Sequence, residues 1–298
     1  MRKAFIQLHF AILLAGFTGI LGRLITIRED WLVWYRMLIA SVSLWILFFF
    51  MKKIERISSR DLLKIFGVGA IVALHWVSFY GSIKYSNVSV ALVCFSAIGF
   101  FTAILEPLIF RKRFSATEIM LGLMVIAGIY IIFHFEPKHK IGIAIGVLSA
   151  LLGGLFPILN RKLLQRHSAE TVTLYEMSGG FLALTLLMPV YALLSPHGKT
   201  VLSLTDLLWL LVLSWFCTVL AFQLLMNALK KISAFTVNLS YNLEPVYGII
   251  LAFFVFRENK ELDWSFYAGL LIILLTVLLQ TVKVYYEHKR GNKDEHPR

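Results

Sequence analysis

The chain has 298 residues, of which 59% are hydrophobic, and its mean hydropathy is +0.78. A soluble protein cannot bury this much apolar surface, so the composition excludes a soluble fold and indicates a polytopic membrane protein. The formal net charge of +12 does not indicate a nucleic-acid partner, because the basic residues lie in short clusters between apolar runs.

Ten apolar runs are long enough, or nearly so, to cross a membrane as helices. In chain order they are residues 4–21, 31–51, 62–83, 88–110, 117–135, 141–164, 172–194, 204–229, 234–256 and 264–282. Residues 1–3 resemble the start of a signal peptide, but no convincing cleavage site follows, so the first run is interpreted as a span. We therefore predict an all-α integral membrane protein with ten transmembrane helices.

Lysine and arginine are concentrated in alternate connectors, and this bias sets the predicted orientation. The richer side contains Arg2, Lys3, Lys52, Lys53, Arg56, Arg60, Arg111, Lys112, Arg113, Arg161, Lys162, Arg166, Lys230, Lys231, Lys283, Lys289, Arg290, Lys293 and Arg298. Cytoplasmic loops carry the excess of basic residues in membrane proteins. Both termini are therefore predicted to lie in the cytoplasm, which agrees with an even number of spans.

The chain also contains an internal repeat. When Lys84 is aligned with Lys230, residues 110–111 and 256–257 both read Phe-Arg, and Ser96 falls on Asn242. Further matches pair residues 15–23 with 153–161, Tyr35 with Tyr175, Asp61 with Asp206 and Gly122 with Gly269. Helices one to five thus match helices six to ten, and because five is odd the second unit must enter from the other face.

Such an inverted-topology repeat is typical of secondary transporters with a central site. The alternative is an old duplication with a purely structural role. We predict a first repeat over residues 1–137, a second over 138–283 and a charged cytoplasmic tail over 284–298.

The repeat and its motifs are similar to the EamA family of the drug/metabolite transporter superfamily. The resemblance depends on two five-helix repeats, Pro245 in the ninth run, Phe256-Arg257-Glu258 at its end and Gly269 in the tenth run. The first repeat departs from this pattern, because Gly99 stands at the place of the proline and Lys112 at that of the glutamate. The resemblance implies an inner-membrane carrier that moves amino acids, metabolites or drugs, usually outward. It also implies a central cavity walled by both repeats, with the fifth and tenth helices peripheral.

The ninth run carries the most informative group of polar residues. At 100° per residue, Asn238, Tyr241, Asn242 and Pro245 share one direction. Lipid offers amides no partners, so this face should line a cavity or a helix interface. Pro245 leaves the carbonyl of Tyr241 without its helical donor. Glu244 borders the face, where a carboxylate could titrate, bind an amine or hydrogen-bond a neighbour.

Polar, aromatic and helix-breaking residues in other apolar runs complete the predicted cavity. They are His75, Trp76 and Tyr80 in the third run, Ser96 in the fourth, Pro157 and Asn160 in the sixth, and Gln223 in the eighth. Histidine titrates near neutral pH, and aromatic rings could stack on a flat substrate or cage an amine. The structural alternative is that these side chains pack helix interfaces.

Arg36 and Glu176 occupy matching places in the two repeats, each about one turn inside the start of its run. Inversion would put Arg36 near the outer face and Glu176 near the inner face, so the two are not expected to pair. Each could gate one mouth of the cavity through an ion pair that breaks on opening. Arg36 could instead snorkel to the interface.

Known catalytic and metal-binding signatures are missing from the sequence. Cys94 and Cys217 lie inside apolar runs without metal-ligand spacing. The chain has no P-loop, no zinc-binding His-Glu-x-x-His and no Gly-x-Ser-x-Gly elbow. We therefore predict no catalytic residue, no metal ligand and no cofactor.

The leading hypothesis is a secondary transporter that exports a small metabolite such as an amino acid by alternating access. The alternatives are a drug or lipid-linked sugar carrier, an integral membrane enzyme, and a scaffold. The expected partners are a small-molecule substrate and the lipid bilayer, with protons left open as a coupling ion. The chain is expected to be a monomer or a homodimer.

Overall fold

The computed structural model describes residues 2–135, 139–194, 198–241, 243–260 and 262–294. Within these ranges the regular structure is helical, without strands. The helices are α1 (Arg2–Leu24), α2 (Glu29–Phe50), α3 (Ser59–Tyr85), α4 (Val88–Phe95), α5 (Ile98–Phe110), α6 (Ala116–Phe135), α7 (Lys140–Leu163), α8 (Ala169–Leu194), α9 (Leu204–Ser214), α10 (Ala221–Leu229), α11 (Ala234–Tyr241), α12 (Leu243–Phe256) and α13 (Trp264–Asp294). A π-helical turn, Trp215–Leu220, joins α9 to α10.

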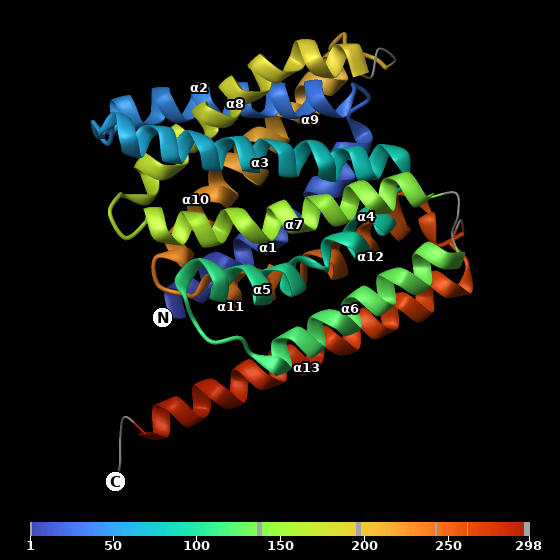
Figure 1. Cartoon of the computed structure of the whole chain (residues 1–298). Helices are drawn as coiled ribbons and strands as arrows, with labels where there is room; N and C mark the ends of the chain where they lie inside the picture. Colours follow the sequence, from blue (N-terminus) through green and yellow to red (C-terminus); the bar gives the residue numbers. More distant parts are fainter. Residues whose placement is uncertain (1, 136–138, 195–197, 242, 261, 295–298) are drawn as a thin grey trace.

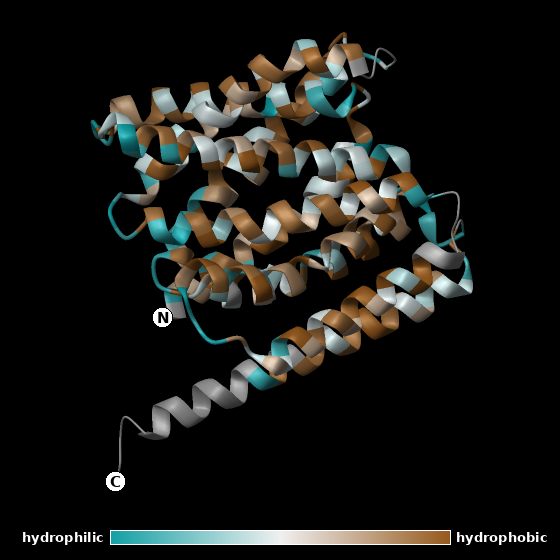
Figure 2. Ribbon diagram, viewed as in Figure 1, coloured by the Kyte–Doolittle hydropathy of each residue, from teal (hydrophilic) through white to brown (hydrophobic). Residues whose placement is uncertain are grey.

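Eight helical stretches in the described part of the chain are long and apolar enough to cross a membrane. Two further stretches, Ala116–Ile132 in α6 and Trp264–Thr276 in α13, are apolar but shorter. Figure 2 shows hydrophobic residues along the lengths of the helices and hydrophilic residues mostly near their ends. Large side chains such as Phe50, Leu186 and Phe254 are exposed, as expected where lipid covers them. The predicted class of all-α membrane protein is confirmed.

The helices run back and forth between two ends of the bundle (Figure 1). We name these the terminal end and the distal end. The start of α1 and the end of α13 lie at the terminal end, with the connectors at residues 51–58, 111–115, 164–168 and 230–233. The connectors at residues 25–28, 86–87 and 198–203 lie at the distal end.

Close backbone contacts organise the packing around α3, which lies against α7 and α8. A Cβ atom at Gly69 would clash with the carbonyl oxygen of Glu176 and lie 2.8 Å from the backbone nitrogen of Gly180. α6 and α13 form a pair at the edge of the bundle (Figure 1). A Cβ atom at Gly269 would lie 2.5 Å from the carbonyl oxygen of Gly128, so these two helices also meet backbone to backbone.

One membrane-crossing stretch, Val88–Phe110, is interrupted within its length, because α4 ends at Phe95 and α5 begins at Ile98. Ser96 lies at this break, and Asn242, with which the repeat alignment pairs it, lies outside the described residues. The break needs no proline, because the chain tightens into three-residue turns in which Ser96 N donates to Val93 O at 3.1 Å.

Candidate functional site

A central cavity of about 70 Å³ lies between helices from both halves of the chain. Its lining residues come from α1, α2, α3, α4, α5, α7, the π-helical turn, α10, α11 and α12. Predicted site residues in the lining are Arg36, His75, Trp76, Pro157, Asn238, Tyr241 and Glu244. A water molecule needs about 10–15 Å³ of such space, so the cavity has room for only a few.

Arg36 is held in the cavity by four groups, although its side chain is only 3% exposed. Its guanidinium donates from Nε to Thr218 Oγ1 at 2.7 Å and from Nη1 to Tyr80 Oη at 2.7 Å. Nη2 donates to the carbonyl oxygen of Cys217 at 3.1 Å. The cation also lies 3.6 Å from the centre of the Trp76 ring. These contacts fix the guanidinium and offset part of its burial.

The acceptors for Arg36 come from the π-helical turn between α9 and α10. Thr218 and Cys217 both belong to this turn, and Thr218 Oγ1 itself donates to Leu213 O at 2.9 Å. Single π-helical turns inside longer helices are frequent at functional sites. The turn was not predicted, because residues 204–229 read as one uninterrupted apolar run.

Glu244 faces the same cavity from the first turn of α12 and is 5% exposed. It is close enough to Arg36 to interact electrostatically. Among the described residues it forms no direct ion pair or hydrogen bond. The cavity therefore holds a fixed cation and a carboxylate that has no partner of its own. This is an arrangement able to bind both ends of a zwitterion.

An aromatic wall covers another side of the cavity. The His75 ring lies 5.5 Å from Phe95 and 5.8 Å from Phe156, and Phe156 stacks on Phe222 at 5.9 Å. His75 Nδ1 is 2.8 Å from the carbonyl oxygen of Ser149. His75 thus lines the cavity as predicted, but the hydrogen bond and the rings also fix it in place. The three phenylalanines were not predicted, since apolar residues in membrane helices are too common to single out.

Asn238 lines the cavity while joining three helices. Its Nδ2 donates to Thr102 Oγ1 of α5 at 2.9 Å and lies 3.4 Å from the carbonyl oxygen of Gly154 in α7. The structural alternative considered for this face therefore applies to Asn238 in part. Pro157 lines the cavity without ending α7, which continues to Leu163.

Several predicted site residues do not line the cavity. Tyr80 lies behind Arg36 and holds it, and Ser96 Oγ donates to Leu92 O at 3.3 Å at the helix break. Gln223 and Pro245 are outside the lining, and Asn242 lies outside the described residues.

The two gating candidates differ from what their positions in the runs predicted. Arg36 was expected near the outer face or snorkelling, but it lies at the central cavity. Glu176 is fully buried and accepts a hydrogen bond from Asn160 Nδ2 at 3.0 Å; neither side chain lines the cavity. As expected, Arg36 and Glu176 do not pair.

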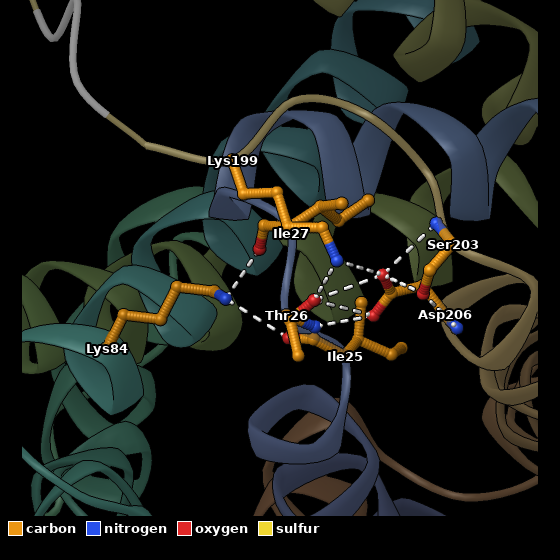
Figure 3. Close-up of polar contacts among 7 residues, drawn as sticks. All are labelled: Ile25, Thr26, Ile27, Lys84, Lys199, Ser203 and Asp206. Atoms are coloured by element: carbon orange, nitrogen blue, oxygen red, sulfur yellow. Dashed lines mark hydrogen bonds and ion pairs between the residues drawn. The ribbon is translucent and has the colours of Figure 1, made fainter.

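Partly buried hydrogen bonds join the helices at the distal end (Figure 3). Asp206, in the first turn of α9, accepts from Thr26 N at 2.7 Å, Thr26 Oγ1 at 3.0 Å and Lys199 Nζ at 3.0 Å. It also forms a reciprocal cap with Ser203. From the end of α3, Lys84 Nζ donates to the carbonyl oxygens on either side of Thr26. We name Thr26, Lys84, Lys199, Ser203 and Asp206 the distal polar cluster.

A second carboxylate at this end joins α1, α4 and the connector after α12. Glu258 is fully buried and accepts from Val88 N at 3.1 Å and from Ser89 N at 2.9 Å. Arg23, near the end of α1, forms an ion pair with it. A carboxylate on the first amides of a helix is favourable, because those amides have no partner within the helix.

Contacts at the terminal end include the ion pair of Lys53 with Glu170, 2.7 Å, whose side chains are 42% and 24% exposed. Exposed ion pairs contribute little to stability. A groove of about 870 Å³ also lies at this end, between α3 and α7.

A helical membrane bundle with an interrupted helix beside a small central cavity that contains charged side chains is typical of membrane transport proteins. Comparison with known sequences agrees. The chain belongs to the EamA-like transporter family, whose model matches residues 2–134 and again residues 140–282. The resemblance that the sequence motifs indicated is therefore confirmed.

Individual relatives are distant. An uncharacterized transporter from Archaeoglobus fulgidus is 24% identical over 262 residues, which cover 85% of this chain and 87% of that protein. A solved crystal structure with 15% sequence identity superposes with a TM-score of 0.65 and covers 95% of this chain and 97% of the other. That similarity concerns the fold alone.

Proposed function

We propose that this chain is a secondary transporter that exports a small zwitterionic metabolite, such as an amino acid, across the inner membrane by alternating access. The observation that carries this proposal is the pair of opposite charges, Arg36 and Glu244, in one buried cavity. Unpaired charges inside a membrane protein are costly and mark substrate or ion pathways.

The chemistry of the cavity suits an amino acid. A guanidinium presents parallel donors that match a carboxylate, and Glu244 supplies an acceptor for an ammonium group. The rings of Trp76, Phe156 and Phe222 provide an apolar surface for a side chain. The present volume is too small for an amino acid, so binding requires the helices around the cavity to move apart.

Alternating access follows from the proposed topology. We count α4 with α5, α9 with α10 and α11 with α12 as single spans, which gives ten spans as two inverted five-helix repeats. The excess of basic residues at the terminal end supports a cytoplasmic location for that end. The distal polar cluster then closes the outer mouth, and the hydrogen bonds that Asp206 accepts from Thr26 and Lys199 break when the site opens outward, whereas its local cap with Ser203 remains.

Glu244 is also the proposed site of proton coupling. It has no hydrogen-bond partner among the described residues, so gain or loss of its proton disturbs no structural network. Its charge acts directly on Arg36 and on any bound ammonium group. A proton taken up from outside would compete with the substrate for this carboxylate, which is the requirement for exchange of proton for substrate.

Transport by purified protein in liposomes tests the proposal. Amino acids are supplied as a mixture, with and without a pH gradient, to the wild type, Glu244→Gln and Arg36→Gln. The control is Glu170→Gln, which makes the same chemical change in an exposed ion pair. We expect flux from the wild type and the control and none from the two cavity variants. Flux that ignores the pH gradient removes proton coupling, and no flux with any amino acid rejects the zwitterion in favour of other metabolites or drugs.

A further inference from the structure

The groove at the terminal end is a second site, distinct from the central cavity. It lies between the start of α3 and the end of α7 and has a volume of about 870 Å³. No described residue lines both spaces. Its size is that of a ligand pocket rather than a packing defect.

One end of the groove is strongly basic. Arg60 and Lys64 reach it from α3, and Lys162 and Arg166 from the end of α7 and the following connector. The single carboxylate there, Asp61, is already occupied: Lys64 lies 2.7 Å from it and His167 3.6 Å. Within the described part of the chain, the side chains of Arg60, Lys162 and Arg166 have no acidic or hydrogen-bonding partner. Three cations are thus free to bind an anion.

The other end of the groove is apolar and open. Gly67 and Ile71 follow Lys64 along one face of α3, opposite Leu159 of α7. A Cβ atom at Gly67 would meet nothing within 4 Å. Leu63 beside the groove is 74% exposed, so this face of α3 is turned to the surroundings of the bundle. The groove therefore passes from a basic end at the membrane surface to an apolar part beside the membrane interior.

We propose that this groove binds an anionic phospholipid from the leaflet at the terminal end. Arg60, Lys162 and Arg166 bind the phosphate, and an acyl chain lies along Gly67, Ile71 and Leu159. A soluble phosphate compound would leave the apolar half uncovered, and a neutral lipid would leave the cations without a counter-charge. Basic pockets between membrane helices bind anionic headgroups in this manner.

Lipid binding to the purified full-length protein tests the site. Native mass spectrometry and thermal unfolding in neutral detergent are followed while phosphatidylglycerol, phosphatidylcholine or glycerol 3-phosphate is added. Each basic residue near an anionic surface contributes about fivefold in affinity. Substituting Arg60, Lys162 and Arg166 together by Gln should weaken phosphatidylglycerol binding about 100-fold by the same rule.

Two further variants separate the groove from general surface charge. A Cβ atom at Gly67 meets nothing within 4 Å, so Gly67→Leu should project into the apolar half and block the lipid while leaving lipid-free unfolding unchanged. The matched control substitutes the exposed Arg56, Arg113 and Lys231 by Gln, outside the groove, and should bind as the wild type does.

Equal binding of phosphatidylcholine would overturn the proposal, as would an equal loss in the control. Displacement of the lipid by glycerol 3-phosphate would show a soluble-phosphate site instead.

Discussion

Asp206→Asn should release the distal end and expose the central cavity to that side. Asparagine keeps one oxygen for the Thr26 amide but places an amide nitrogen where the second oxygen accepts from Lys199 and Ser203. In the proposed outward-open conformation the contacts of Asp206 with Thr26 and Lys199 are broken. The substitution should therefore destabilise the closed conformation.

The size of the effect follows from the bonds that are lost. A hydrogen bond to a charged group contributes about 1.5–3 kcal/mol. The lower value applies to Lys199, because its side chain is nearly half exposed. A loss of about 1.5 kcal/mol shifts the equilibrium between closed and open about tenfold.

Cys217 provides a native reporter of opening. It lines the central cavity, whereas the other cysteine, Cys94, is buried outside it. In a Cys94→Ala background, a membrane-impermeant maleimide applied at the distal face should label Cys217 slowly in the wild type. Asp206→Asn should accelerate this labelling about tenfold, by the shift above. Labelling from the terminal face should slow.

The control is Ser203→Ala, which removes only the cap of α9 and leaves Thr26 and Lys199 bonded to Asp206. Loss of a cap costs about 1 kcal/mol of stability, but it should not change the labelling rate. Equal labelling rates for the wild type and Asp206→Asn would refute the proposal that the distal polar cluster closes this end of the bundle. Equal acceleration by Asp206→Asn and Ser203→Ala would refute it as well.

Four other substitutions test the packing and the buried polar groups. Gly69→Ala should lower the unfolding free energy by about 1–3 kcal/mol, because its Cβ meets the backbone of α8. Gly67→Ala should raise the unfolding free energy by up to about 1 kcal/mol. Thermal unfolding in detergent measures both, and the opposite ranking of the two variants would contradict the α3–α8 crossing. Glu258→Gln should lower stability by about 1–3 kcal/mol by weakening the acceptor for the first amides of α4; an unchanged melting temperature would count against it. Asn160→Ala should lower stability by about the same amount, because Glu176 loses its hydrogen-bond donor. It should leave the KM for transport unchanged, and a raised KM would show that Asn160 and Glu176 contact the substrate.

The class of fold was predictable because a lipid-exposed helix must be apolar along most of its length. The ninth run was also informative, because amides and a carboxylate at helical spacing find no hydrogen-bond partners in lipid and must line a cavity or a helix interface. Asn238, Tyr241 and Glu244 lie together at the cavity for this reason. Their grouping on a single element made them visible from sequence.

The place of Arg36 was not predictable from its run. Hydropathy starts the second run at residue 31, but α2 begins at Glu29 with two acidic residues buried. Tyr191 Oη donates to Glu29 at 2.6 Å, and Arg28 pairs with Asp30 at 2.6 Å. These partners come from the tertiary structure or the local turn. They allow charged residues to extend the helix and leave Arg36 deeper in the bundle than the run suggests.

Contacts between distant segments were equally hidden. The sequence motif at the end of the ninth run includes Glu258, but its role as the acceptor for the first amides of α4 depends on how α1 and α4 meet. Tyr80 was singled out as cavity lining, whereas its hydroxyl positions Arg36. In both cases the sequence singled out the residue, but its role depends on a contact with a segment far away in the chain.

The glycine crossing of α6 and α13 has a mechanical consequence. Gly128 and Gly269 touch through their backbones, with no side chain between them. Side-chain contacts, such as those of Asp206, can exchange partners as helices tilt, but two backbones in contact have no rotamers to adjust. We therefore expect the α6–α13 pair to move as one rigid unit along one edge of the bundle. Helices around the cavity can tilt against it while the first and second halves of the chain stay joined.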